Sequence, residues 1–138
     1  MKMHIIILTS LAMLPINSAI SDSATVENLM QSYKANGAVS PNAEHGKGLW
    51  GKTFKAKGEF AERSCTTCHT DDLTVTGKHV KTRKTIKPMS PSVNPERLTK
   101  SRKVEKWFKR NCKWTLGREC GAQEKADILL YIANTTSF

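Results

Sequence analysis

The residues most able to do chemistry are five consecutive ones, CTTCH at positions 65–69 of a 138-residue chain. Cys65 and Cys68 lie on one helical turn, so their thiols can form thioethers with the two vinyl groups of a haem, and His69 can then present its imidazole to the iron. A zinc site or a CxxC redox pair would use the same residue types. Zinc would need a fourth ligand at a plausible spacing, and a redox pair would need a βαβ context that the sequence lacks. The motif therefore predicts one covalently bound haem c with His69 as its proximal ligand.

The residue on the opposite side of the iron decides the function. An electron carrier holds both axial positions, whereas a gas binder leaves one open or opens it on demand. Met89, in the stiff segment KPMSP, could supply a sulfur ligand, but it could equally pack against the haem edge as an apolar filler. His45, in a glycine-rich stretch, and His79, among lysines, are weaker candidates.

Asn111 is an unusual candidate for the same position. On a helical wheel, Val104, Trp107, Phe108 and Asn111 fall within about 100° of one another, with Asn111 near the centre of the apolar stripe. A buried amide needs a partner, because leaving it unpaired costs on the order of 1–3 kcal/mol. The haem iron, or a molecule bound to it, would be such a partner. The wheel alone leaves a second interpretation open, in which Asn111 caps the end of the helix before Cys112.

The first 22 residues have the pattern of an export signal. Lys2 precedes an apolar run from Ile5 to Leu14, and a proline and small residues follow. The run is shorter than the roughly 20 residues of a membrane-spanning helix, which argues against an anchor. We expect residues 1–22 to be removed, leaving a periplasmic cytochrome c domain at 23–138.

The cysteine count then leaves Cys112 and Cys120, which are eight positions apart. In an oxidising compartment these two residues are expected to form a disulfide. The alternative is a pair of free buried thiols.

Composition and charge narrow the class of protein further. Hydrophobic residues make up 38% and aromatics 7% of the chain, which is lean for a packed core unless a haem fills part of it. The length excludes a multidomain enzyme, and the composition excludes a multi-span membrane protein.

The segment 78–113 holds 13 Lys and Arg residues against two acids. The positive charge of this segment either keeps the protein soluble or steers it towards an acidic redox partner. Export and a haem argue against nucleic acid as a ligand. No general acid–base pair is apparent in the sequence, so we do not expect an enzyme.

The hydrophobic pattern predicts an all-α protein, a small class I-like cytochrome c fold wrapped around one haem. We expect helices over 24–35, after the Ser40-Pro41 cap, from Ser101 and after Gly121. The second of these helices would carry Leu49, Trp50 and Phe54 on its apolar face. Residues 77–95 are expected to form a wrapped loop, and no strand pattern is evident.

Three stretches carry a family resemblance that covers roughly residues 25–134. They are SCTTCHT, the PSVNP loop at 91–95, and RNC followed by REC at 110–120. Together they resemble the sphaeroides haem protein (SHP) family of oxygen-binding cytochromes c, and the chain is also similar to cytochrome c″.

The resemblance implies that Asn111 is the distal ligand, because SHP-like proteins carry an asparagine immediately before the first disulfide cysteine; cytochrome c″ has histidine there. It also supports the Cys112–Cys120 bridge and implies a dihaem cytochrome c or a membrane cytochrome b as electron source. Met89 departs from these relatives, which usually carry an apolar residue such as leucine, and it is the alternative sixth ligand.

The sequence therefore predicts a periplasmic monohaem cytochrome that accepts electrons and is not an enzyme. Reduction would release Asn111, and the ferrous haem would then bind O2 or NO. The alternative is a plain electron carrier with a fixed sixth ligand such as Met89.

Overall fold

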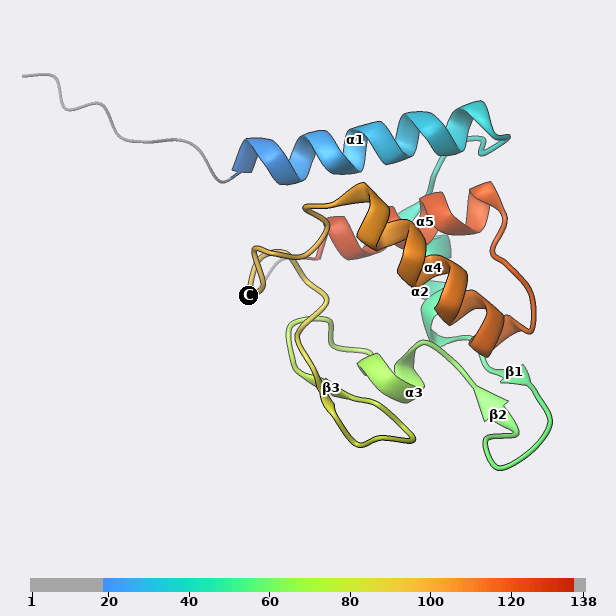
Figure 1. Cartoon of the computed structure of the whole chain (residues 1–138). Coiled ribbons are helices and arrows are strands. Elements are labelled where there is room, and N and C mark those ends of the chain that lie inside the picture. The colour runs from blue at the N-terminus through green and yellow to red at the C-terminus, as the bar shows by residue number, and fades with distance from the viewer. Residues whose placement is uncertain (1–18, 136–138) are drawn as a thin grey trace, which may run out of the picture.

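The computed structural model describes residues 19–135, so most of the expected signal, residues 1–18, lies outside it. The described chain is mainly helical, as the hydrophobic pattern predicts (Figure 1). The helices are α1 (Ala19–Ala35), α2 (Ala43–Gly51), α3 (Thr66–His69), α4 (Ser101–Leu116) and α5 (Ala122–Ala133). Within the described residues, no helix is long and apolar enough to cross a membrane.

Four two-residue strands interrupt this pattern, and the sequence did not predict them. They form two antiparallel pairs, β1 (Phe54–Lys55) with β2 (Glu62–Arg63) and β3 (Gly77–Lys78) with β4 (Thr85–Ile86). Each strand is too short to show an alternating hydrophobic pattern, which explains why they were missed. The rest of the expected loop at 77–95 is irregular or turn.

Two further details of the expected second helix were wrong. The N-cap is Asn42 rather than Ser40, and its side-chain oxygen accepts hydrogen bonds from the backbone N–H groups of Glu44 and His45 at 2.8 and 3.1 Å. An asparagine oxygen satisfies the free N–H groups of the first turn in the same way as a serine hydroxyl. Phe54 lies in β1, because the helix already ends at Gly51.

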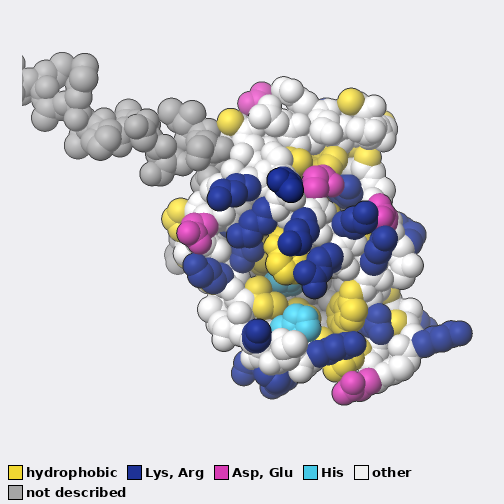
Figure 2. All heavy atoms as spheres, in the orientation of Figure 1, with side chains coloured by type: hydrophobic (Ala, Val, Ile, Leu, Met, Phe, Trp, Pro, Cys, Tyr) yellow, Lys and Arg dark blue, Asp and Glu magenta, His cyan; other side chains and the backbone are white. Residues whose placement is uncertain are grey.

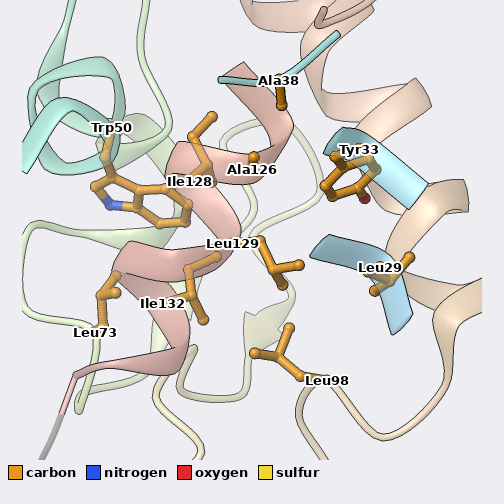
Figure 3. Close-up of a cluster of buried hydrophobic side chains, with 10 residues drawn as sticks. All are labelled: Leu29, Tyr33, Ala38, Trp50, Leu73, Leu98, Ala126, Ile128, Leu129 and Ile132. Atoms are coloured by element: carbon orange, nitrogen blue, oxygen red, sulfur yellow. The ribbon is translucent and has the colours of Figure 1, made fainter. Parts of the chain in front are cut away.

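The hydrophobic core lies where α5 packs against α1 and α2 (Figure 3). Leu29 and Tyr33 of α1 and Trp50 of α2 are buried against this helix. The α5 residues Ala126 and Leu129 are fully buried. The two helices expected over 24–35 and after Gly121 therefore both contribute buried residues to the core.

The contact between α2 and α5 is close because Gly46 has no side chain. A Cβ at this position would overlap the backbone carbonyl of Asp127. The Asp127 carboxylate is buried and accepts a hydrogen bond from the backbone N–H of Asn42 at 2.7 Å, which joins the start of α2 to α5.

Candidate functional site

A cavity of about 570 Å³ lies between α4, α5, the α3 segment and the 77–100 region. This volume is within the range of about 300–1,000 Å³ that is usual for cofactor sites. Every site residue predicted from the sequence contributes to its wall: Cys65, Cys68, His69, Met89, Asn111, Cys112 and Cys120. Figure 2 shows hydrophobic and histidine side chains in a hollow that Lys and Arg side chains surround.

The CxxCH segment is held in place by short-range hydrogen bonds. Ser64, directly before Cys65, exchanges hydrogen bonds with Thr67: its N–H donates to the Thr67 hydroxyl at 3.0 Å, and its hydroxyl accepts from the Thr67 N–H at 3.2 Å. At the other end, the Trp50 indole N–H donates to the Thr70 carbonyl at 2.8 Å. The bond from Trp50 fixes the short helix α3 against α2.

His69 has the surroundings of a metal ligand. Its ring lies 5.5 Å from that of Trp50, and its Nδ1 is buried without a hydrogen-bond partner among the described residues. Burial, together with the positive charge of Arg97 and the nearby His79, lowers the pKa of His69 to about 4. The imidazole is therefore neutral at physiological pH, the form that binds a metal.

The two thiols of the motif are free and half-buried. Burial raises the pKa of the Cys65 thiol to about 12. A redox-active CxxC pair has the opposite property, a lowered thiol pKa. No group of three or more His, Cys, Asp or Glu side chains in the described part of the chain is arranged to hold a metal ion. The cavity wall therefore fits a haem joined to both thiols and facing His69.

Asn111 faces this cavity from the middle of α4. The helix continues to Leu116, and its C-cap is Gly117, in the left-handed conformation at φ 75°. Asn111 is therefore not at a helix end, and the interpretation of it as a cap before Cys112 is wrong. Phe108 and Val104, about one and two turns earlier, line the same cavity.

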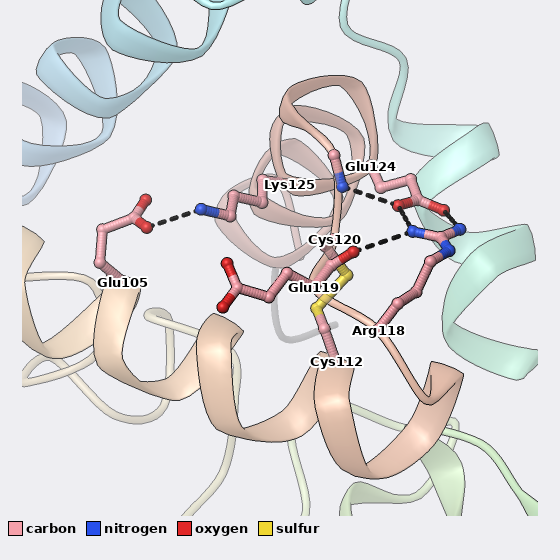
Figure 4. Close-up of a disulfide and its surroundings, with 8 residues drawn as sticks. Glu105, Cys112, Arg118, Glu119, Cys120, Glu124 and Lys125 are labelled. Carbon is pink, nitrogen blue, oxygen red and sulfur yellow. Dashed lines mark hydrogen bonds and ion pairs between the residues drawn. A yellow bond between two sulfur atoms is a disulfide. The ribbon is translucent and has the colours of Figure 1, made fainter.

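Cys112 and Cys120 form the predicted disulfide, with their Cα atoms 5.5 Å apart (Figure 4). Both residues are buried. The bridge joins the last turns of α4 to the segment before α5. Within the bridged loop, Arg118 donates two hydrogen bonds of 2.7 Å to the Glu124 carboxylate. The same carboxylate accepts from the backbone N–H of Gly121 at 2.9 Å, and these bonds keep its pKa below the usual range.

The alternative ligands differ in their positions. Met89 is half-buried in the cavity wall, and its backbone N–H donates to the Leu73 carbonyl at 2.9 Å. His79 lies at the cavity surface, where its Nδ1 accepts hydrogen bonds from the backbone N–H groups of Lys81 and Thr82 at 3.3 and 3.2 Å. His45 is exposed on α2 and does not line the cavity.

Sequence reasoning missed three residues that shape this site. Trp50 was predicted only as an apolar helix residue, and neither Arg63 nor Trp114 was singled out. Arg63 donates to the Trp114 backbone carbonyl at 2.8 Å, and Trp114 lines the cavity. The separation of 51 positions leaves no local signal for such a pair.

The chain is similar to known proteins over most of its length. The family model described as "Domain of unknown function (DUF1924)" matches residues 36–132. The cytochrome c-type protein SHP of Cereibacter sphaeroides is 39% identical over 115 residues, which are 83% of this chain and 88% of the relative. Cytochrome c″ of Methylophilus methylotrophus is 33% identical over 124 residues, which are 86% of this chain and 85% of the relative.

Solved structures give the same result. The structure of oxidised SHP, described as an oxygen-binding cytochrome c, matches with a TM-score of 0.72 and 40% identity, covering 80% of this chain and 96% of that one. The crystal structure of oxidised cytochrome c″ from Methylophilus methylotrophus matches with a TM-score of 0.70 and 32% identity, covering 86% and 97%. A solution structure of the same cytochrome c″, concerned with the structural basis of haem-ligand detachment, matches with a TM-score of 0.68 and 31% identity, covering 86% and 96%.

Proposed function

We propose a function on the premise that this chain belongs to the DUF1924 family and to the family of SHP-like monohaem cytochromes c. The chain carries one covalent haem c, and we assign its attachment to Cys65 and Cys68 and its proximal ligand to His69. When bound, the haem supplies an iron that changes oxidation state and can take a small ligand. We further propose that the chain binds a diatomic gas, O2 or NO, after it accepts an electron.

The position of Asn111 carries this proposal. Its amide lies on the cavity-facing stripe of α4, between Phe108 and Trp114, and has no role at a helix end. We assign it as the sixth ligand of the oxidised protein. The assignment is supported by the oxygen binding described for SHP and the ligand detachment described for cytochrome c″.

The chemistry of the amide explains why Asn111 leaves on reduction. An amide is a weak, neutral and hard donor, which ferric iron accepts. Ferrous iron carries less positive charge and attracts a hard donor less. Asn111 therefore releases the distal side of the cavity, and its freed amide can donate a hydrogen bond to an incoming gas molecule.

The second candidate function, a plain electron carrier, rests on one observation. Met89 lies in the wall of the same cavity and carries a soft sulfur, which binds iron well in both oxidation states. If Met89 holds the sixth position, reduction opens no site.

The remaining assignments concern the surroundings of the protein. Seven basic residues contribute to the cavity wall: Lys81, Lys84, Lys87, Arg97, Lys100, Lys103 and Arg110. We propose that they neutralise the haem propionates and steer an acidic redox partner, a dihaem cytochrome c or a membrane cytochrome b. Export to the periplasm by residues 1–22 and a mature domain at 23–138 remain predictions from the sequence.

A pair of substitutions tests the ligand assignment. Asn111→Ala should keep the covalent haem but leave ferric iron without its protein sixth ligand, so the ferric absorption spectrum should change to that of a five-coordinate or water-ligated haem. Met89→Leu removes the competing sulfur and should leave that spectrum unchanged. A ferric spectrum that responds to Met89→Leu and not to Asn111→Ala would identify the protein as the plain carrier.

A further inference from the structure

The guanidinium of Arg63 joins two parts of the cavity wall that are distant in sequence. Arg63 ends β2, two residues before Cys65. Its Nε and Nη2 donate to the carbonyls of Phe60 and Lys57 in the preceding turn, at 2.8 and 3.3 Å. Its Nη1 donates to the carbonyl of Trp114 in α4, at 2.8 Å. One side chain therefore links the segment that carries the thiols to the last turn of α4.

The Trp114 carbonyl is a suitable acceptor for this bond. It is one of the last four carbonyls of α4, which lack partners inside the helix. A positive charge is also favourable there, because the C-terminal end of a helix carries partial negative charge. The guanidinium carbon of Arg63 lies 4.8 Å from the centre of the Trp114 ring as well. Arg63 thus contacts both the backbone and the side chain of Trp114.

Trp114 is next to Asn111 on the helix surface, because residues three apart are neighbours on one face. Both residues line the cavity. Cys112, between them in sequence, is bonded to Cys120. The turn that carries Asn111 is therefore held from two sides, by the disulfide on the α5 side and by Arg63 on the CxxCH side.

We propose that Arg63 is a positioning residue for Asn111, and this inference rests on the function proposed above. By joining the attachment segment to the end of α4, Arg63 fixes how far the distal turn lies from the haem that Cys65 and Cys68 hold. Without this link the turn moves more freely, and Asn111 occupies the sixth position for a smaller fraction of the time. Lysine cannot replace Arg63 fully, since a single ammonium cannot donate to three carbonyls and also stack on an indole.

Three variants of the mature, haem-loaded protein test the proposal. Arg63→Gln removes the charge and the stacking, and Arg63→Lys keeps the charge alone. Arg102→Gln is the matched control: it removes the same charge from the first turn of α4, where Arg102 is exposed and forms no ion pair within the described residues. The readouts are the ferric absorption spectrum, which reports the coordination and spin state of the iron, and the hydrogen-exchange rates of the amides at 112–116.

Arg63→Gln should raise the ratio of Asn111-free to Asn111-bound ferric protein about tenfold, the order of change that loss of a charged hydrogen bond produces. Exchange at 112–116 should accelerate. Arg63→Lys should give an intermediate shift, and Arg102→Gln none. If Arg63→Gln loads no haem, Arg63→Lys compared with Arg102→Lys decides the question by the same readouts.

The Asn111→Ala variant separates the two possible failures. If Asn111→Ala changes the ferric spectrum but Arg63→Gln matches Arg102→Gln, the positioning role is wrong and the proposed function stands. A loss of thermal stability in Arg63→Gln without a change of spin state also overturns the positioning role. If Asn111→Ala itself leaves the ferric spectrum unchanged, the proposed function is wrong and Arg63 has no ligand to position.

Discussion

Single residues determine how closely the chain approaches the CxxCH helix. Gly77, at the start of β3, is buried against the last residues of this helix. A Cβ at position 77 would overlap the carbonyl oxygen of Cys68 and lie 3.0 Å from the Cα of His69. Because both of these atoms belong to the backbone, neither can rotate away. Glycine at this position is therefore a requirement for placing the proposed haem ligand.

We expect Gly77→Ala to destabilise the protein by about 1–3 kcal/mol, the usual cost of overpacking, and to lower the yield of haem-loaded protein. Urea unfolding followed by circular dichroism measures the free-energy change. Gly48→Ala is the control, since a Cβ there meets nothing within 4 Å and glycine inside a helix is unfavourable. Equal stability of the two variants would show that the approach of Gly77 is not a constraint.

At the scale of elements, α4 determines most of the cavity wall on the side of Asn111. Its apolar stripe, its termination at Gly117 and its bridged cysteine are all local features, and for that reason the stripe and the bridge could be predicted from the sequence. Periodicity placed Asn111 on the cavity face. It did not show how far the helix continues, and so it left the cap interpretation open until the end of α4 was located at Leu116.

The disulfide is the strongest constraint on the end of this helix. Replacing Cys112 and Cys120 together by serine should lower the free energy of unfolding by about 2–3 kcal/mol, as the loop-entropy estimate gives for a ring of this size. The freed turn should also hold Asn111 in place less firmly, and the ferric spectrum should shift partly towards that of Asn111→Ala. Thermal unfolding and absorption spectra of the double variant test both effects. A spectrum identical to that of the parent protein would mean that the bridge does not restrain the distal turn.

At the scale of the whole molecule, the sequence predicted the class of fold and part of the cavity wall. The CxxCH motif and the amphipathic helices are short-range patterns that a reader of the sequence can recognise. The packing of Trp50 on His69 and the contact of Arg63 with Trp114 join residues that are distant in sequence, and no local pattern encodes them. The β1–β2 and β3–β4 pairs are local, but their strands are too short to show a pattern. The Lys and Arg residues around the cavity are an intermediate case between these two groups. Their charge could be predicted from the sequence, but their position around the site could not (Figure 2).

The most direct test of this account is the absorption spectrum of the reduced mature protein before and after carbon monoxide is added. If Asn111 leaves on reduction, the ferrous protein is high-spin with a free sixth position, and its spectrum shifts at once when carbon monoxide is added. A ferrous protein that stays low-spin and does not respond to carbon monoxide would contradict the account and would point to a fixed ligand such as Met89.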